Sequence, residues 1–318
     1  MAFTPSPASR PALRTRPKDP RFLELQSAAA RADVLVCGLP FDGAVLGRKG
    51  ASGGPTGIRE AFRFLASHDP DRGVDLASLR WHDLGDLDGL DADDTLATHE
   101  TVRAALQKVF AKGKPLVVLG GDNSLSFPVV QALCQARAAK WGTVGLIVLD
   151  AHYDVRPVDG QPSSGTPYGR ILTELDGHPV QPANLAEAGI RPFANTKALA
   201  DRAAQLGLKP VTLQQVRSKG AVAAAQAALA QAGKGTKTLW LSLDLDVLDQ
   251  SIAPGVSAPG IGGMALSEAA EFVHRVAADP RCAGMDLVEC APELDPTGNT
   301  ARAAAYLVAV FVGGVASR

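Results

Sequence analysis

Cysteine is scarce in this sequence of 318 residues, and the four cysteines are not spaced as the ligands of a metal site usually are. This argues against a zinc site built from paired cysteines and against the disulfide framework of a small secreted protein. An excess of charge is also missing, because the formal net charge is −1. No nucleic acid or anionic membrane is therefore expected as a partner. Three of the cysteines lie in apolar surroundings, and we expect them to be reduced core residues of a cytoplasmic protein.

Long apolar runs are absent as well, so no segment is predicted to span a membrane. The N-terminal residues are rich in Pro, Arg and Ser and have no apolar core, which argues against a secretory signal. We expect residues 1–20 to form a flexible arm that an oligomer contact could order. Residues 21–318 show no repeat, linker or composition break, and 46% of the sequence is hydrophobic. They are predicted to form a single domain with a sizeable core.

Short apolar runs alternate with helix-forming segments along the chain. Strands are predicted at 32–38, 115–119, 144–149, 185–190, 211–213, 238–243 and 284–289, and helices at 95–112, 127–139, 220–233, 265–278 and 300–312. This alternation predicts an α/β protein with a parallel, doubly wound sheet.

Three connecting segments are distinctive. Residues 81–86 are predicted to form an acidic loop after a short strand. The glycine-rich loop 47–55 is typical of backbone that approaches something closely, although a plain surface connection has the same composition. Residues 155–168 are irregular, and long irregular connections in α/β domains are usually functional loops or lids.

Polar residues two positions apart follow the apolar run 144–149. If the extended backbone continues, Asp150, His152 and Asp154 lie on the same side of the strand. Two carboxylates and an imidazole that converge in this way suit a metal ion, because a buried carboxylate without a partner is costly. A solvated loop is the alternative that this stretch leaves open.

Other acids end neighbouring strands. Asp122, Asp244 and Glu289 each follow an apolar run, and Asp246 repeats the two-residue spacing after Asp244. Ligands of open α/β sheets bind at this carboxyl edge. An oxygen-rich set with one histidine favours Mn²⁺ or a similar hard ion, and so many carboxylates favour two ions over one. Two adjacent ions can share and ionise a water.

The chain resembles the ureohydrolases, the family of arginase, agmatinase and formimidoylglutamase. The resemblance covers roughly residues 33–312 and is strongest in Gly120-Gly-Asp-Asn-Ser124, Asp150-Ala-His-Tyr-Asp154 and Ser242-Leu-Asp-Leu-Asp-Val-Leu-Asp249. It implies a three-layer α/β/α fold around a mostly parallel eight-stranded sheet, a small-molecule substrate, a homo-oligomer and two Mn²⁺ ions per chain.

The resemblance also implies residue roles. Asp150 and Asp244 would bridge the ions, while His152 and Asp246 complete one ion's shell and Asp154 the other's. Asp154 would orient the attacking hydroxide, and Glu289 would pair with the cationic group of the substrate. The family's first metal ligand is usually a histidine, and Asn123 stands in its place. Its amide oxygen is either a weaker metal ligand or a loop-capping group.

A second departure concerns the substrate. Residues 163–168, Ser-Ser-Gly-Thr-Pro-Tyr, lack the histidine that agmatinases and arginases have before the glycine, and they resemble formimidoylglutamases instead. Formimidoylglutamate carries two carboxylates, which arginine binds well. The candidate substrate-binding residues are Arg156, Ser164, Gly165, Arg191 and Glu289, and each arginine could equally belong to a surface salt bridge.

The sequence therefore leaves three functions in order of preference. The first is manganese-dependent hydrolysis of a linear amidine, N-formimidoyl-L-glutamate, to L-glutamate and formamide. The second is hydrolysis of a guanidino compound such as agmatine, guanidinobutyrate or arginine, with release of urea. The third is a metal-poor, non-catalytic subunit, which the asparagine at position 123 suggests.

Overall fold

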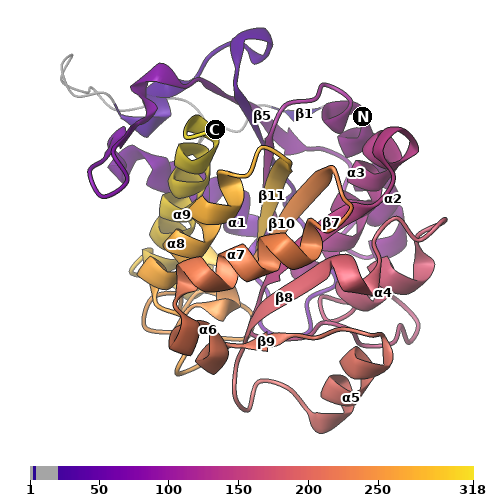
Figure 1. Ribbon diagram of the computed structural model, residues 1–318. Helices are drawn as coiled ribbons and strands as arrows, with labels where there is room; N and C mark the ends of the chain where they lie inside the picture. The colour runs from indigo at the N-terminus through magenta and orange to yellow at the C-terminus, as the bar shows by residue number, and fades with distance from the viewer. Residues whose placement is uncertain (1–2, 5–20) are drawn as a thin grey trace.

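A single large sheet runs through the computed structural model, which describes residues 3–4 and 21–318 (Figure 1). Eight of its strands are parallel, and a short strand at one edge is antiparallel, in the order β1-β5-β2-β6-β11-β10-β7-β8-β9. This confirms the predicted eight-stranded parallel sheet. Its strands are β1 (Phe3–Thr4), β5 (Trp81–Leu87), β2 (Val34–Gly38), β6 (Leu116–Leu119), β11 (Cys282–Val288), β10 (Thr238–Asp244), β7 (Val144–Leu149), β8 (Leu185–Ile190) and β9 (Val211–Thr212).

Helices cover both faces of the sheet, which makes the three layers that were predicted (Figure 1). One apolar core joins the sheet to α1 (Gly54–Ala61), α6 (Leu213–Lys219), α7 (Ala221–Ala232), α8 (Leu266–Ala277) and α9 (Asn299–Ala316). The other core joins it to α2 (Thr95–Phe110), α3 (Ser126–Trp141), α4 (Pro167–Glu174) and α5 (Lys197–Gln205). A separate small hairpin pairs β3 (His68–Asp69) with β4 (Val74–Asp75).

The register of the central strands determines which residues meet at the carboxyl edge. Leu243 of β10 pairs with Leu149 of β7, so the next residues along both strands, Asp244 and Asp150, are neighbours. Asp244 also pairs with Val288 of β11, immediately before Glu289. Every residue of β7 and β10 is buried, as expected for parallel strands that are covered on both faces.

The predicted acidic loop at 81–86 is wrong, because these residues lie within β5. Asp83 and Asp86 bind the buried Arg59 of α1 instead of a ligand. The guanidinium Nε donates to Asp83 Oδ2 at 2.7 Å, and Nη1 donates to Asp86 Oδ1 at 2.5 Å. Acidic residues are thus tolerated in this strand because a cation from the covering helix pairs with them.

Arg59 is therefore expected to be important for stability. In Arg59→Met, the carboxylate of Asp83, whose side chain is only 1% exposed, would be left buried without its cation. We expect the free energy of unfolding to fall by about 3–5 kcal/mol, measured by urea denaturation. As a control, Arg103→Met removes an ion pair to the exposed Glu100 and should cost less than about 1 kcal/mol. Equal losses in the two variants would contradict this assignment.

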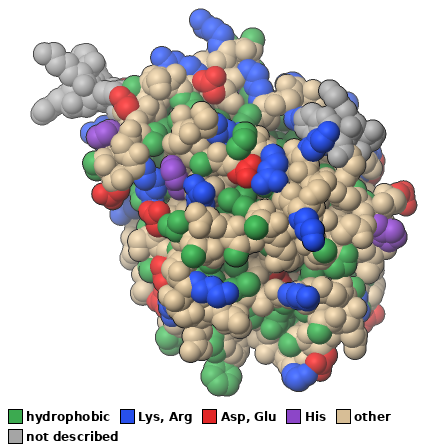
Figure 2. Space-filling view, viewed as in Figure 1, with side chains coloured by type: hydrophobic (Ala, Val, Ile, Leu, Met, Phe, Trp, Pro, Cys, Tyr) green, Lys and Arg blue, Asp and Glu red, His purple; other side chains and the backbone are tan. Residues whose placement is uncertain are grey.

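Several shorter elements differ from the sequence prediction. The irregular stretch 155–168 ends in α4, which begins at Pro167, and α5 and α6 were not predicted. Helix α9 is long and apolar enough to cross a membrane by composition, but 67% of it is buried within the protein. It packs on α8 and α1, so we interpret it as a core helix. On the face shown in Figure 2, charged side chains of both signs are scattered among other residues.

Of the arm expected at residues 1–20, only Phe3–Thr4 is described, and it pairs with β5. The other arm residues lie outside the described part of the chain.

Candidate metal centre and active site

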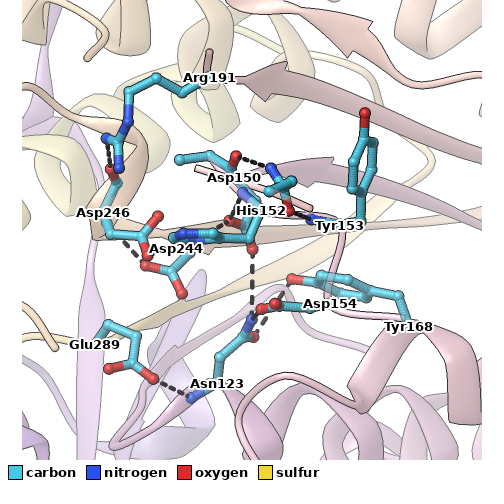
Figure 3. A network of polar contacts seen from close by, with 12 residues as sticks. Asn123, Asp150, His152, Tyr153, Asp154, Tyr168, Arg191, Asp244, Asp246 and Glu289 are labelled. Carbon is cyan, nitrogen blue, oxygen red and sulfur yellow. Dashed lines mark hydrogen bonds and ion pairs between the residues drawn. The ribbon is translucent and has the colours of Figure 1, made fainter. Parts of the chain in front are cut away.

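The acidic side chains that follow β7 and β10 converge at the carboxyl edge of the sheet (Figure 3). One potential ligand atom from each of Asp150, His152 and Asp246 lies within 4.8 Å of the others. The same holds for a second triad, Asp150, Asp154 and Asp244. The two triads share Asp150, so the residues singled out from sequence spacing do come together in space.

Two residues at this edge of the sheet, Asp154 and Glu289, have a strained backbone. Asp154 has φ of 43° and Glu289 has φ of 69°, a region that residues with a side chain rarely adopt. Glu289 is held there by its amide, which donates to the carbonyl of Gly121 at 2.8 Å. Backbone strain of this kind clusters at functional sites, where the fold maintains a particular side-chain direction.

The carboxylates form a buried negative cluster that lacks Lys or Arg ion pairs among the residues described. Burial and then the neighbouring Asp246 raise the pKa of Asp150 to about 6. Burial and the adjacent acids raise the pKa of Asp154 and Asp244 well above the usual range. Buried carboxylates so close together require cations or protons.

His152 compensates part of this charge. Its Nδ1 lies 2.9 Å from Asp246 Oδ2, and its amide donates to Asp150 Oδ1 at 2.6 Å. Burial lowers the pKa of His152, but Asp246 and Asp150 outweigh burial and raise it to about 12. An ion bound by the imidazole would take the place of that proton, because only neutral histidine is a ligand.

Asn123 lies beneath the second triad. Its Nδ2 donates to Asp154 Oδ2 at 2.7 Å, and its Oδ1 accepts from Ser126 Oγ at 2.9 Å. To ligate an ion through oxygen, the amide would have to turn over. The neighbouring hydroxyls can accept as well as donate, so they suit either orientation. The role of Asn123 as a ligand remains a prediction.

A buried polar network behind Asn123 was missed from the sequence. Asp286 of β11 accepts hydrogen bonds from Ser126 Oγ at 2.7 Å and Ser242 Oγ at 2.8 Å, and also from Trp240 Nε1. Tyr168 OH lies 3.1 Å from Ser242 Oγ. These residues come from four separate elements, so no local sequence pattern could have revealed the network.

A cavity of about 120 Å³ opens over the centre. Besides the acids, its walls include Arg156, Ser164 and Gly165, which were predicted to bind substrate. Four other lining residues were not among the predicted site residues, although one of them, Gly47, belongs to the glycine-rich loop that was expected to approach something closely. They are Leu46, Gly47, Ser257 and Ala258.

The predicted substrate loop is tied to its surroundings. Ser164 Oγ accepts from the Leu46 amide at 3.1 Å, which leaves its hydroxyl proton available. The Arg156 amide donates to the Gly165 carbonyl at 2.9 Å. A Cβ at Gly165 would lie 2.7 Å from Arg156 Cδ, so only glycine leaves the arginine side chain in this position.

Arg191, the other arginine predicted to bind substrate, lies beside the candidate metal centre. It does not line the cavity over the acids, and its Nη1 donates to the carbonyl of Asp246 at 2.9 Å. Its own hollow, of about 270 Å³, also includes Tyr153, Asn195 and Lys197. In this structure Arg191 supports the backbone of Asp246, and its contact with substrate remains a prediction.

Comparison with known proteins agrees with this geometry. The Arginase family model matches residues 32–313. A formimidoylglutamase of Halobacterium salinarum is 38% identical over 311 residues, which cover 94% of this chain and 95% of that protein.

Solved structures give the same picture. The crystal structure of formimidoylglutamase from Bacillus subtilis superposes with a TM-score of 0.88 at 30% identity and covers 96% of both chains. Trypanosoma cruzi formiminoglutamase with Mn²⁺ has a TM-score of 0.86 at 32% identity, with 94% of this chain and 99% of that chain covered. From its family match, its fold and the acids at its sheet edge, the chain belongs to the arginase family.

Proposed function

We propose that the protein hydrolyses N-formimidoyl-L-glutamate to L-glutamate and formamide with manganese. The observation that carries the proposal is one cavity in which metal-type acids, Glu289 and the cationic Arg156 line the same space. The relatives named formimidoylglutamase, which align with most of the chain, support the choice of substrate.

The donor set suits Mn²⁺, because carboxylate oxygens and an imidazole match a hard to intermediate divalent ion. Asp246 Oδ1 is buried and has no hydrogen-bond donor among the described residues, as expected of an atom whose partner is a cation. We infer two ions per chain because Asp150 belongs to both triads. In this proposal Asp150, His152, Asp154, Asp244 and Asp246 hold them.

Manganese bound there would supply a water of lowered pKa, which could attack near neutral pH. Asp154 would hold this water and receive its proton. Glu289 Oε2, which has no partner among the described residues, would accept a hydrogen bond from the amidinium. Arg156 at the wall of the cavity would bind a substrate carboxylate.

The reaction balances with these groups alone. Water oxygen bonds to the amidine carbon, and the bond between that carbon and the glutamate nitrogen breaks. Asp154 passes the first proton of the water to the leaving nitrogen, so no histidine shuttle is needed. The second proton leaves the oxygen as the formamide carbonyl forms, and the glutamate amine takes it up. The products are formamide and glutamate.

A product assay tests the substrate. The protein, purified with added manganese, is incubated separately with formimidoylglutamate, agmatine, guanidinobutyrate and arginine. We expect formamide from the first and no urea from the others. Urea together with an unreacted formimidoyl substrate would establish the guanidino alternative instead.

Arg156 provides a sharper test of the carboxylate contact. Arg156→Met should raise KM for formimidoylglutamate about tenfold or more and change kcat little, because the lost ion pair helps to bind the ground state. The control is a formimidoyl amine without carboxylates, whose kinetics should be the same in wild type and variant. An equal effect on both substrates would assign Arg156 to the structure of the loop.

Metal analysis tests the third function, that of a metal-poor, non-catalytic subunit. About two manganese ions per chain would argue against a non-catalytic assembly subunit, and none would support one. The homo-oligomer and the cytoplasmic location expected from the sequence stay predictions.

A further inference from the structure

Glu187 is a buried acid that the proposed mechanism does not use. It lies in the middle of β8, opposite Val148 of β7, and is 2% exposed. Both of its carboxylate oxygens are inaccessible and have no hydrogen-bond partner among residues 3–4 and 21–318. Leu185, two residues earlier on the same face of the strand, belongs to the apolar core shared with α4 and α5.

A carboxyl group in such a place is expensive, and glutamine or an apolar residue would avoid the cost of burying a charge. The titratable groups near it are acids and a phenol rather than cations. Burial, followed by Asp150 and Asp154, raises the pKa of Glu187 well above its usual range. The pKa of Tyr153 is raised first by the burial of its own side chain and second by the nearby Glu187. Among the described side chains Glu187 therefore has no positive partner.

A cation bound at the acidic cluster would supply the missing positive charge. Val148, which pairs with Glu187, is two residues before Asp150. Glu187 is therefore on the strand next to the residue that both triads share. We propose that Glu187 is a positioning residue of the metal centre: it ligates no ion, but its buried carboxylate pairs electrostatically with the bound cations and strengthens their binding. This inference rests on the proposed function, because it requires a cation at the acidic cluster.

The proposal predicts a coupling that a merely structural acid would lack. Without metal, the neighbouring carboxylates favour the protonated form of Glu187. When divalent ions neutralise Asp150 and Asp154, the local field changes sign and favours the ionised form. Ion binding should therefore release one more proton from the wild type than from a variant without this acid.

The experiment titrates metal-free protein with MnCl₂ by calorimetry, without substrate, in two buffers of different ionisation enthalpy. We expect Glu187→Gln to weaken manganese binding about tenfold and to release about one proton fewer per chain. Glu187→Met, which suits the apolar surroundings, should weaken binding similarly. The control Asp201→Asn removes an exposed carboxylate from α5 and should match the wild type.

The outcomes are distinguishable. Weaker binding in both Glu187 variants, with melting temperatures of the metal-free proteins at or above the wild-type value, would support the inference and exclude a folding defect. Wild-type affinity and proton release in both variants would overturn it and leave the proposed function intact. A wild-type protein that binds no manganese would overturn both.

Discussion

Replacing Glu289 with glutamine should lower kcat/KM for the formimidoyl substrate roughly a thousandfold, the loss expected when a buried charge partner is neutralised. Glu289 Oε1 already accepts a hydrogen bond from the backbone N–H of Asn123 at 2.8 Å, and a glutamine oxygen can keep that contact. Oε2 is buried and has no partner in the described part of the chain, and the amide that replaces it cannot pair with a cationic amidine. Steady-state kinetics and metal analysis of the same preparation measure the effect.

The metal content should stay at the wild-type value, because neither triad includes Glu289. Glu293→Gln is a matched control, since it changes an exposed glutamate a few residues further along. It should leave kcat/KM unchanged. If Glu289→Gln lost manganese in parallel with activity, Glu289 would belong to the metal site rather than to the substrate site.

Asp150→Asn should have the largest effect of any single substitution. Asp150 is the only residue common to both triads, so its loss weakens both candidate ion sites together. We expect less than about one manganese ion per chain and activity reduced roughly ten-thousandfold, because no activated water would form. Atomic absorption on dialysed protein and the product assay provide the two measurements.

Asp249→Asn is the control within the same type of motif. Asp249 ends the run that contains Asp244 and Asp246, but its carboxylate accepts hydrogen bonds from the amides of Ser251 and Gly262. The hydrogen bond that the Ser251 hydroxyl donates, followed by those of the backbone amides, lowers the pKa of Asp249 to about 2. Its variant should keep wild-type metal content, and full metal retention in Asp150→Asn would contradict the proposed centre.

Asp150 and Asp249 differ in how well the local sequence predicts their roles. Asp150, His152 and Asp154 follow a buried strand at two-residue intervals, and so do Asp244 and Asp246 after theirs. An apolar strand followed by polar residues of that period is a local signal, and it was enough to single out five candidate metal ligands. The N–H groups that Asp249 caps lie up to 14 residues away, and no such period indicates them.

The sequence by itself determined the central strands, the alternation with helices and the direction in which the acids point, because these depend on neighbours within a few residues. Only the tertiary structure decided that Asp83 and Asp86 bind Arg59 and that Arg191 supports the backbone of Asp246. It also decided that Glu187, one strand from Asp150, has no partner among the described residues. These contacts depend on strand order and register. They join residues far apart in the chain, such as Asn123 and Glu289, which are 166 positions apart.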